Sequence, residues 1–142
     1  MSIDALSVLI GTWHLTGRSV GADHDNITGE LTGRAILGGQ VLELAGTMRI
    51  GEQAISSLEL VWADEAGGDF AAHVYPPSAG APLDYRWARS GATLTHAGLG
   101  ATYTGTISDD GTTITGGWRA DPGQPEHPGS SYDAIMRRVG AA

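Results

Sequence analysis

The chain has 142 residues, a length typical of one folded domain, so we predict a single domain over residues 1–142. Its net charge is −8, and all 8 basic side chains are arginines. An acidic chain repels phosphate backbones, which excludes nucleic acid as an expected partner. No apolar run approaches the roughly 20 residues of a membrane span, and the start at Met1 lacks the basic segment of a secretory signal. We therefore expect a cytoplasmic protein without a membrane partner. Cysteine is absent, which removes disulfides and thiolate chemistry.

The first structural element is a short helical pattern over residues 3–10 that ends at Gly11. From there apolar and polar residues alternate with a period of two, and turn residues interrupt the alternation roughly every 8–12 positions. This pattern predicts an all-β fold, a roughly ten-stranded antiparallel up-and-down β-barrel with a short N-terminal helix. The predicted strands span residues 12–20, 26–37, 40–50, 54–63, 69–75, 83–89, 92–97, 101–108, 112–120 and 131–139.

The predicted connections differ between the two ends of the barrel. Tight glycine turns, such as Gly38-Gly39, Ser90-Gly91 and Asp109-Asp110-Gly111, fall at one end. The longer loops, Pro76 to Pro82 and Asp121 to Gly129, fall at the other end. We therefore expect one closed end and one end whose larger loops are candidates for a lid.

The direction of each side chain follows from parity, because successive residues of a strand point to opposite faces. In the fourth strand, apolarity favours Leu58, Leu60 and Trp62 on the inner face and places Glu59 outside. The fifth strand is ambiguous, although apolarity favours the face that carries Phe70.

Aromatic and polar residues predicted to face inward, in the open half of their strands, indicate a cavity for a small, largely apolar ligand. A core packed solid by the same side chains is the alternative. The candidate ligand-binding residues are Ser56, Trp62, Tyr85, Trp87, His96, Tyr103, Trp118 and Tyr132. His96 is the candidate catalytic residue, because an imidazole suits proton transfer near neutral pH. The alternative for His96 is a core histidine hydrogen-bonded to a tyrosine.

Two carboxylates, Glu43 and Glu59, occupy repeated Leu-Glu-Leu triplets on adjacent strands. Both are predicted outside, where pairing with Arg34 or Arg49 across strands is the expected use. The histidines show no pair at metal-ligand spacing. We expect neither a metal site nor a cofactor.

The segment Gly11-Thr12-Trp13, directly after the short helix, resembles the Gly-x-Trp signature of the lipocalin-like (calycin) barrels. The resemblance implies that Trp13 closes the barrel floor and that a basic residue near the end of the last strand, Arg138 or its neighbour Arg137, packs over it. More closely, the chain resembles an uncharacterised bacterial family of small lipocalin-like proteins. The matching stretches are Leu9 to Trp13, Arg34 to Gly39, Ser57 to Leu60, and Gly116 to Arg119 followed by Asp121-Pro122-Gly123. This family implies the fold and a hydrophobic cavity, and no established reaction.

Binding of a small, largely hydrophobic molecule is therefore the expected function, with two alternatives left open. One is a cofactor-free cyclase or isomerase in which His96 transfers a proton and Tyr85 or Tyr103 donates a hydrogen bond. The other is a haem protein like the nitrobindins, whose haem-ligating histidine lies near the C-terminal strand. The segment 130–139 of this chain has no histidine, which disfavours haem. A homodimer that pairs through outer faces remains one alternative for the oligomeric state.

Overall fold

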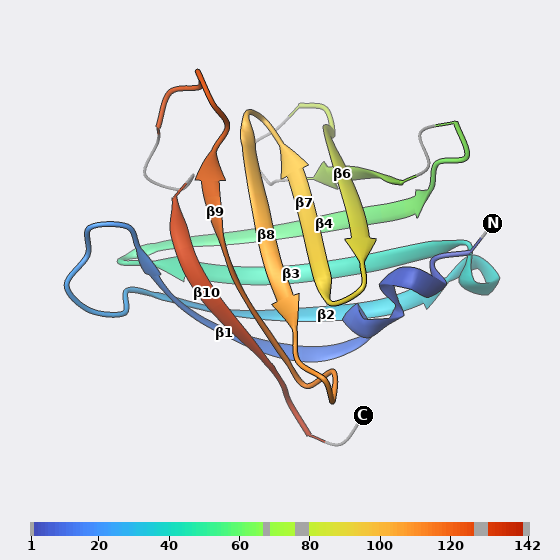
Figure 1. Cartoon of the computed structure of the whole chain (residues 1–142), viewed down its shortest axis with the longest axis horizontal. Helices are drawn as coiled ribbons and strands as arrows, with labels where there is room; N and C mark the ends of the chain where they lie inside the picture. Colours follow the sequence, from blue (N-terminus) through green and yellow to red (C-terminus); the bar gives the residue numbers. More distant parts are fainter. Residues whose placement is uncertain (1, 67–68, 76–79, 127–130, 141–142) are drawn as a thin grey trace.

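The computed structural model describes residues 2–66, 69–75, 80–126 and 131–140. Within these residues ten antiparallel strands close into one barrel, in which each strand pairs with its neighbours along the chain and β1 pairs with β10. In Figure 1 the strands β2–β4 run across the view and β6–β9 cross them steeply. The strands are β1 (Gly11–Ser19), β2 (Ile27–Ile36), β3 (Val41–Ile50), β4 (Gln53–Ala63), β5 (Phe70–Tyr75), β6 (Leu83–Ser90), β7 (Thr93–Gly98), β8 (Ala101–Ile107), β9 (Thr113–Ala120) and β10 (Tyr132–Arg138).

The prediction of an all-β, ten-stranded up-and-down barrel is confirmed, and each predicted strand end lies within one residue of the observed one. The helical segment forms as a 3-10 helix, η1 (Asp4–Leu9). A second short 3-10 turn, η2 (Leu37–Gly39), connects β2 to β3 where a tight glycine turn was expected. No helix among the described residues is long and apolar enough to cross a membrane.

The closed end of the barrel is built around Trp13, which is fully buried. Its indole Nε1–H donates to the carbonyl of Leu9, the last residue of η1, over 3.3 Å. The guanidinium carbon of Arg138 lies 4.4 Å from the centre of the Trp13 ring. This contact joins the first strand to the last strand, because Trp13 and Arg138 are also directly paired in the β1–β10 ladder. The expected packing of Arg138 over Trp13 is confirmed.

The guanidinium of Arg138 also binds the segment that enters the barrel. Its Nη1 donates to the carbonyl of Ile10 over 2.6 Å, and its Nη2 donates to the carbonyl of Val8 over 2.8 Å. Nη2 lies within 3.3 Å of the carbonyl of Gly111, in the β8–β9 turn. Carbonyl groups at a helix end lack partners within the helix, so Arg138 satisfies oxygens that η1 leaves free.

The glycines that face inward have different roles. A Cβ atom at Gly33 would overlap the carbonyl oxygen of Leu9, so this glycine lets η1 pack directly against β2. At Gly105 a Cβ would lie 2.5 Å from the hydroxyl oxygen of Tyr103, so this glycine makes room for the Tyr103 ring. A Cβ at Gly46 would meet its neighbours at ordinary distances of 3.5 Å or more, and Gly46 faces the interior cavity.

The predicted faces of β4 are wrong. Val61 is fully buried and pairs with the buried Leu42 of β3, whereas Glu59 pairs with the buried Leu44. Glu59 therefore points into the barrel, and Trp62 and Ser56 lie on the outer face. The two-residue turn between β3 and β4 imposes this register, because it pairs Ile50 with Gln53 and thereby aligns every later pair.

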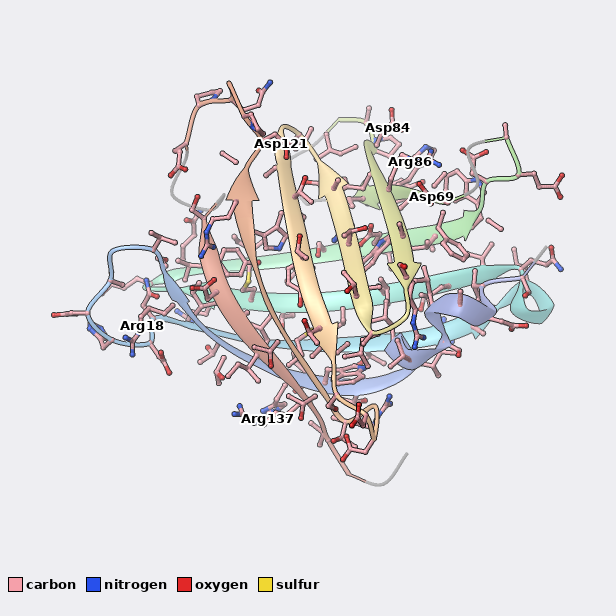
Figure 2. The ribbon with its side chains drawn as sticks, viewed as in Figure 1. Arg18, Asp69, Asp84, Arg86, Asp121 and Arg137 are labelled. Carbon is pink, nitrogen blue, oxygen red and sulfur yellow. The ribbon has the colours of Figure 1, made fainter. Side chains whose placement is uncertain are left out.

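The outer wall carries most of the charge. The carboxylate of Glu43 pairs with Arg34 across β2 and β3, as expected. In Figure 2 the labelled side chains of Arg18 and Arg137 lie at the periphery of the ribbon, away from the barrel interior. Residues 76–79 and 127–130, parts of the two loops considered as a lid, lie outside the described residues, so the lid stays a prediction.

Candidate functional site

The barrel contains a partly open cavity of about 220 Å³. Its aliphatic lining comes mainly from β1 to β4, which contribute Leu15, Leu31, Leu44, Met48 and Ile55. The facing wall is aromatic and comes from β6 to β10. The interior is therefore not packed solid, and one side of the cavity differs chemically from the other.

The aromatic wall is a belt of five ring side chains, one from each of five consecutive strands: Trp87, His96, Tyr103, Trp118 and Tyr132. Each is directly paired in register with the next, from β6 to β10. All five belong to the set predicted from the sequence. The register of the antiparallel ladder thus gathers the predicted residues at one level of the barrel.

Three other predicted residues lie elsewhere. Tyr85 faces inward, and its ring centre lies 5.1 Å from that of His96, but it is not part of the cavity lining. Trp62 lies on the outer face, where its ring contacts that of His73 edge-on at 4.9 Å. Ser56 is exposed on the same outer face of β4, and the neighbouring Ser57 lines the cavity in its place.

A buried carboxylate lies against the aromatic belt. Glu59 is 7% exposed and crosses from β4 to residues of β6 and β7. Its Oε2 accepts a hydrogen bond from Nε1–H of Trp87 over 2.9 Å and lies 2.8 Å from Nε2 of His96. His96 is therefore bound to a carboxylate, and not to a tyrosine as one interpretation of the sequence proposed.

The protonation of this Glu59–His96 pair determines what it offers to a ligand. When Glu59 is ionised and His96 is neutral, Oε2 accepts from Nε2–H and the His96 Nδ1 carries a lone pair. When the pair has no net charge, the shared proton lies either on Nε2 of a His96 imidazolium or on Glu59, and in both cases Nδ1 carries a hydrogen. No described residue bonds to Nδ1. Every fully buried side-chain nitrogen or oxygen of the described residues has a partner, so Nδ1 is not fully buried and a ligand can reach it.

The imidazole of His96 is held in place by rings on several sides. It stacks on Trp87 with ring centres 3.8 Å apart and planes 11° apart, and Trp118 meets it edge-on at 5.2 Å. A stacked indole stabilises an imidazolium through its negative face. Burial and the negative charge of Glu59 together raise the pKa of the nearby Tyr85 phenol.

Two phenols of the belt remain protonated well above neutral pH. Burial raises the pKa of Tyr103 and that of Tyr132 to about 12. The Tyr132 hydroxyl lies 3.8 Å from the sulfur of Met48, a weak acceptor. No described residue bonds to the Tyr103 hydroxyl, and Tyr103 is part of the cavity lining.

Glu59 is the member of the site that inference from the sequence missed. The length of the β3–β4 turn could have placed it inside. A two-residue connection at Gly51-Glu52 pairs the inward residues of β3 with Glu59 and Val61. The apolar character of Leu58, Leu60 and Trp62 suggested the opposite face.

Within the described ranges, no group of three or more histidine or acidic residues is arranged to hold a metal ion. The cavity lining offers instead the bonded Glu59 carboxylate and His96 imidazole, phenol hydroxyls and the polar residues Glu30, Thr47 and Ser57, in largely apolar surroundings. No protein-family model matches this chain, and no curated protein matches it.

Proposed function

We propose that this protein binds a small, largely apolar molecule inside the barrel, with one polar group of that molecule directed at the Glu59–His96 pair. The observation that carries the proposal is the cavity of about 220 Å³ inside the barrel, with an aliphatic wall, an aromatic wall and this pair among its few polar groups. Small-molecule sites share this composition, in which apolar lining supplies affinity and a few polar groups fix orientation.

We also propose that the chain is a calycin-like barrel. Three features support this placement: the closed ten-stranded antiparallel architecture, the entry of Gly11-Thr12-Trp13 from a short helix, and the contact of Arg138 with Trp13. Barrels of this kind use their interior to hold small ligands.

The size of the cavity sets the size of the ligand. Apolar cavities of roughly 150 Å³ hold a benzene-sized molecule, so this cavity suits a ligand of one or two rings. At about 0.7 kcal/mol for each non-hydrogen atom, a bicyclic molecule such as 2-naphthol gains about 8 kcal/mol, which corresponds to a micromolar Kd.

The test fills the cavity without disturbing the fold. Gly46→Leu places a side chain in the cavity, and the ordinary contact distances at its Cβ predict that the barrel tolerates it. Ala45→Leu adds the same bulk to an exposed position on the outer face of the same strand, and serves as the matched control.

We expect 2-naphthol to quench the tryptophan fluorescence of the unmodified protein and of Ala45→Leu with the same micromolar Kd, and Gly46→Leu to bind at least tenfold more weakly. Equal binding by Gly46→Leu, or no binding by the unmodified protein, would overturn the proposal. Native mass spectrometry of protein purified from its own host then identifies a molecule retained in the barrel.

A further inference from the structure

We propose that the Glu59–His96 pair is a proton-transfer centre, and that the cavity catalyses proton shifts in apolar ketones that carry an acidic C–H next to the carbonyl. This inference rests on the proposed binding function and adds a reaction to it. It starts from Glu59, which lies inside the barrel although the apolar pattern of its strand predicted the outer face.

The geometry matches what a base needs. A catalytic imidazole works best when one ring nitrogen is held by a carboxylate and the other faces the substrate. In this barrel Nε2 of His96 lies 2.8 Å from Oε2 of Glu59, and Nδ1 is free of protein partners among the described residues. Glu59 is itself fixed by Nε1–H of Trp87, so the direction of the imidazole is set before a ligand binds.

Proton uptake at Nδ1 produces a well-stabilised state. The resulting imidazolium faces the Glu59 carboxylate on one edge and the Trp87 ring, 3.8 Å away, on one face. In the largely apolar surroundings of the cavity, both interactions are stronger than they are in solution. The charge that forms on His96 is therefore compensated within the site.

The step balances without a co-reactant. Nδ1 forms a bond to the proton as the C–H bond next to the carbonyl breaks. The electron pair of that bond becomes the new C=C bond, and the carbonyl π pair moves to oxygen. The Tyr103 hydroxyl donates a hydrogen bond to this oxygen, as a protonated phenol can. The hydrogen on Nδ1 exchanges with solvent, and Nδ1 then returns a proton to the same carbon, or to the γ carbon of an unsaturated ketone, which yields an isomer of the substrate.

The competing explanation is that Glu59 only satisfies the buried Trp87 and His96. The experiment separates the two roles by measuring exchange of the carbon-bound hydrogens of 2-tetralone in D2O by proton NMR, with 2-naphthol as a planar inhibitor that resembles its enol. The variants are Glu59→Gln and His96→Gln. The control is Glu43→Gln, the same change in the other Leu-Glu-Leu triplet, on the outer face.

We expect the unmodified protein and Glu43→Gln to catalyse exchange at the same rate, with inhibition by 2-naphthol. His96→Gln removes the base, and Glu59→Gln supplies an amide N–H to Nε2, which turns Nδ1 into a donor. Each should lower kcat by about 100-fold or more. For Glu59→Gln, which acts through His96, the KM and the 2-naphthol Kd should stay within about threefold.

The outcomes separate this inference from the binding function. If 2-naphthol binds but the unmodified protein catalyses exchange no faster than Glu59→Gln and His96→Gln do, the proton-transfer role is refuted and the binding function stands. If 2-naphthol does not bind, both are refuted. Should a variant fail to give the far-ultraviolet circular dichroism of the folded barrel, Gly46→Leu decides in its place. It leaves the pair intact and fills the cavity, so exchange must disappear, and persistence of exchange overturns the inference.

Discussion

Arg138 ties the last strand of the barrel to its first elements, so replacing it should destabilise the protein more than any other change to an arginine. Arg138→Met keeps the length of the side chain and removes its charge and its donors. The change eliminates the contact with the Trp13 ring at 4.4 Å and the hydrogen bonds to the carbonyls of Ile10 and Val8 at 2.6 and 2.8 Å.

The expected loss in the free energy of unfolding is the sum of the contributions of these contacts. A guanidinium over an indole contributes about 0.5–2 kcal/mol, and each hydrogen bond from a charged donor contributes about 1.5 kcal/mol at the lower end of its range. Together they predict a loss of about 4 kcal/mol in the free energy of unfolding. For a chain of this size the corresponding fall in Tm is about 12 °C, at about 3 °C for each kcal/mol.

The assay is equilibrium unfolding in urea, followed by tryptophan fluorescence and circular dichroism. The control is Arg137→Met, because Arg137 is the next residue, is exposed, and makes no hydrogen bond or ion pair within the described ranges; Figure 2 places it outside the barrel. The control should change the free energy of unfolding by less than about 0.5 kcal/mol. A loss below about 1 kcal/mol in Arg138→Met would refute the role assigned to this arginine.

Three further predictions concern the interior. Gly33→Ala should lower the free energy of unfolding by about 3 kcal/mol in urea titration, because its Cβ overlaps the Leu9 carbonyl, whereas Gly46→Ala should be nearly neutral. Trp87→Phe should lower the free energy of unfolding by about 1.5–3 kcal/mol, because the buried Glu59 carboxylate loses a hydrogen-bond donor. Tyr103 ionises near pH 10 when unfolded and near pH 12 when folded, so stability should fall as pH rises from 10 to 12. Tyrosinate absorbance of the folded protein that saturates below pH 11 would contradict this assignment.

The strands and their order were predictable because the alternation of apolar and polar residues is nearly unbroken and glycine marks the turns. The aromatic belt was predictable for the same reason. Trp87, His96, Tyr103, Trp118 and Tyr132 each share parity with clearly apolar neighbours, so one inner face could be assigned to each strand. Short connections then place the first four of these residues, from Trp87 to Trp118, in register, and the longer β9–β10 connection brings Tyr132 beside Trp118.

The face of β4 was not predictable from apolarity, because its outer face is as apolar as its inner one. Leu58, Leu60 and Trp62 pair on the outer surface with Tyr75, His73 and Ala71 of β5, and they are half-buried against one another. Cross-strand packing of this kind stabilises a sheet without facing its core. Hydrophobic character therefore indicated a packed face but not which side of the sheet it occupied, and the two-residue turn decided that question.

The two Leu-Glu-Leu triplets show what register alone can do. Glu43 lies outside and pairs with Arg34, whereas Glu59 lies inside and contacts Trp87 and His96. Among the described residues, Glu59 is the one charged side chain that is buried. Stability is a weak reason for such a placement, because apolar residues of similar volume often replace a buried ionic pair at no cost or with a gain. The cavity beside the pair offers another reason, under the binding function proposed above: the carboxylate would direct the imidazole toward the bound molecule.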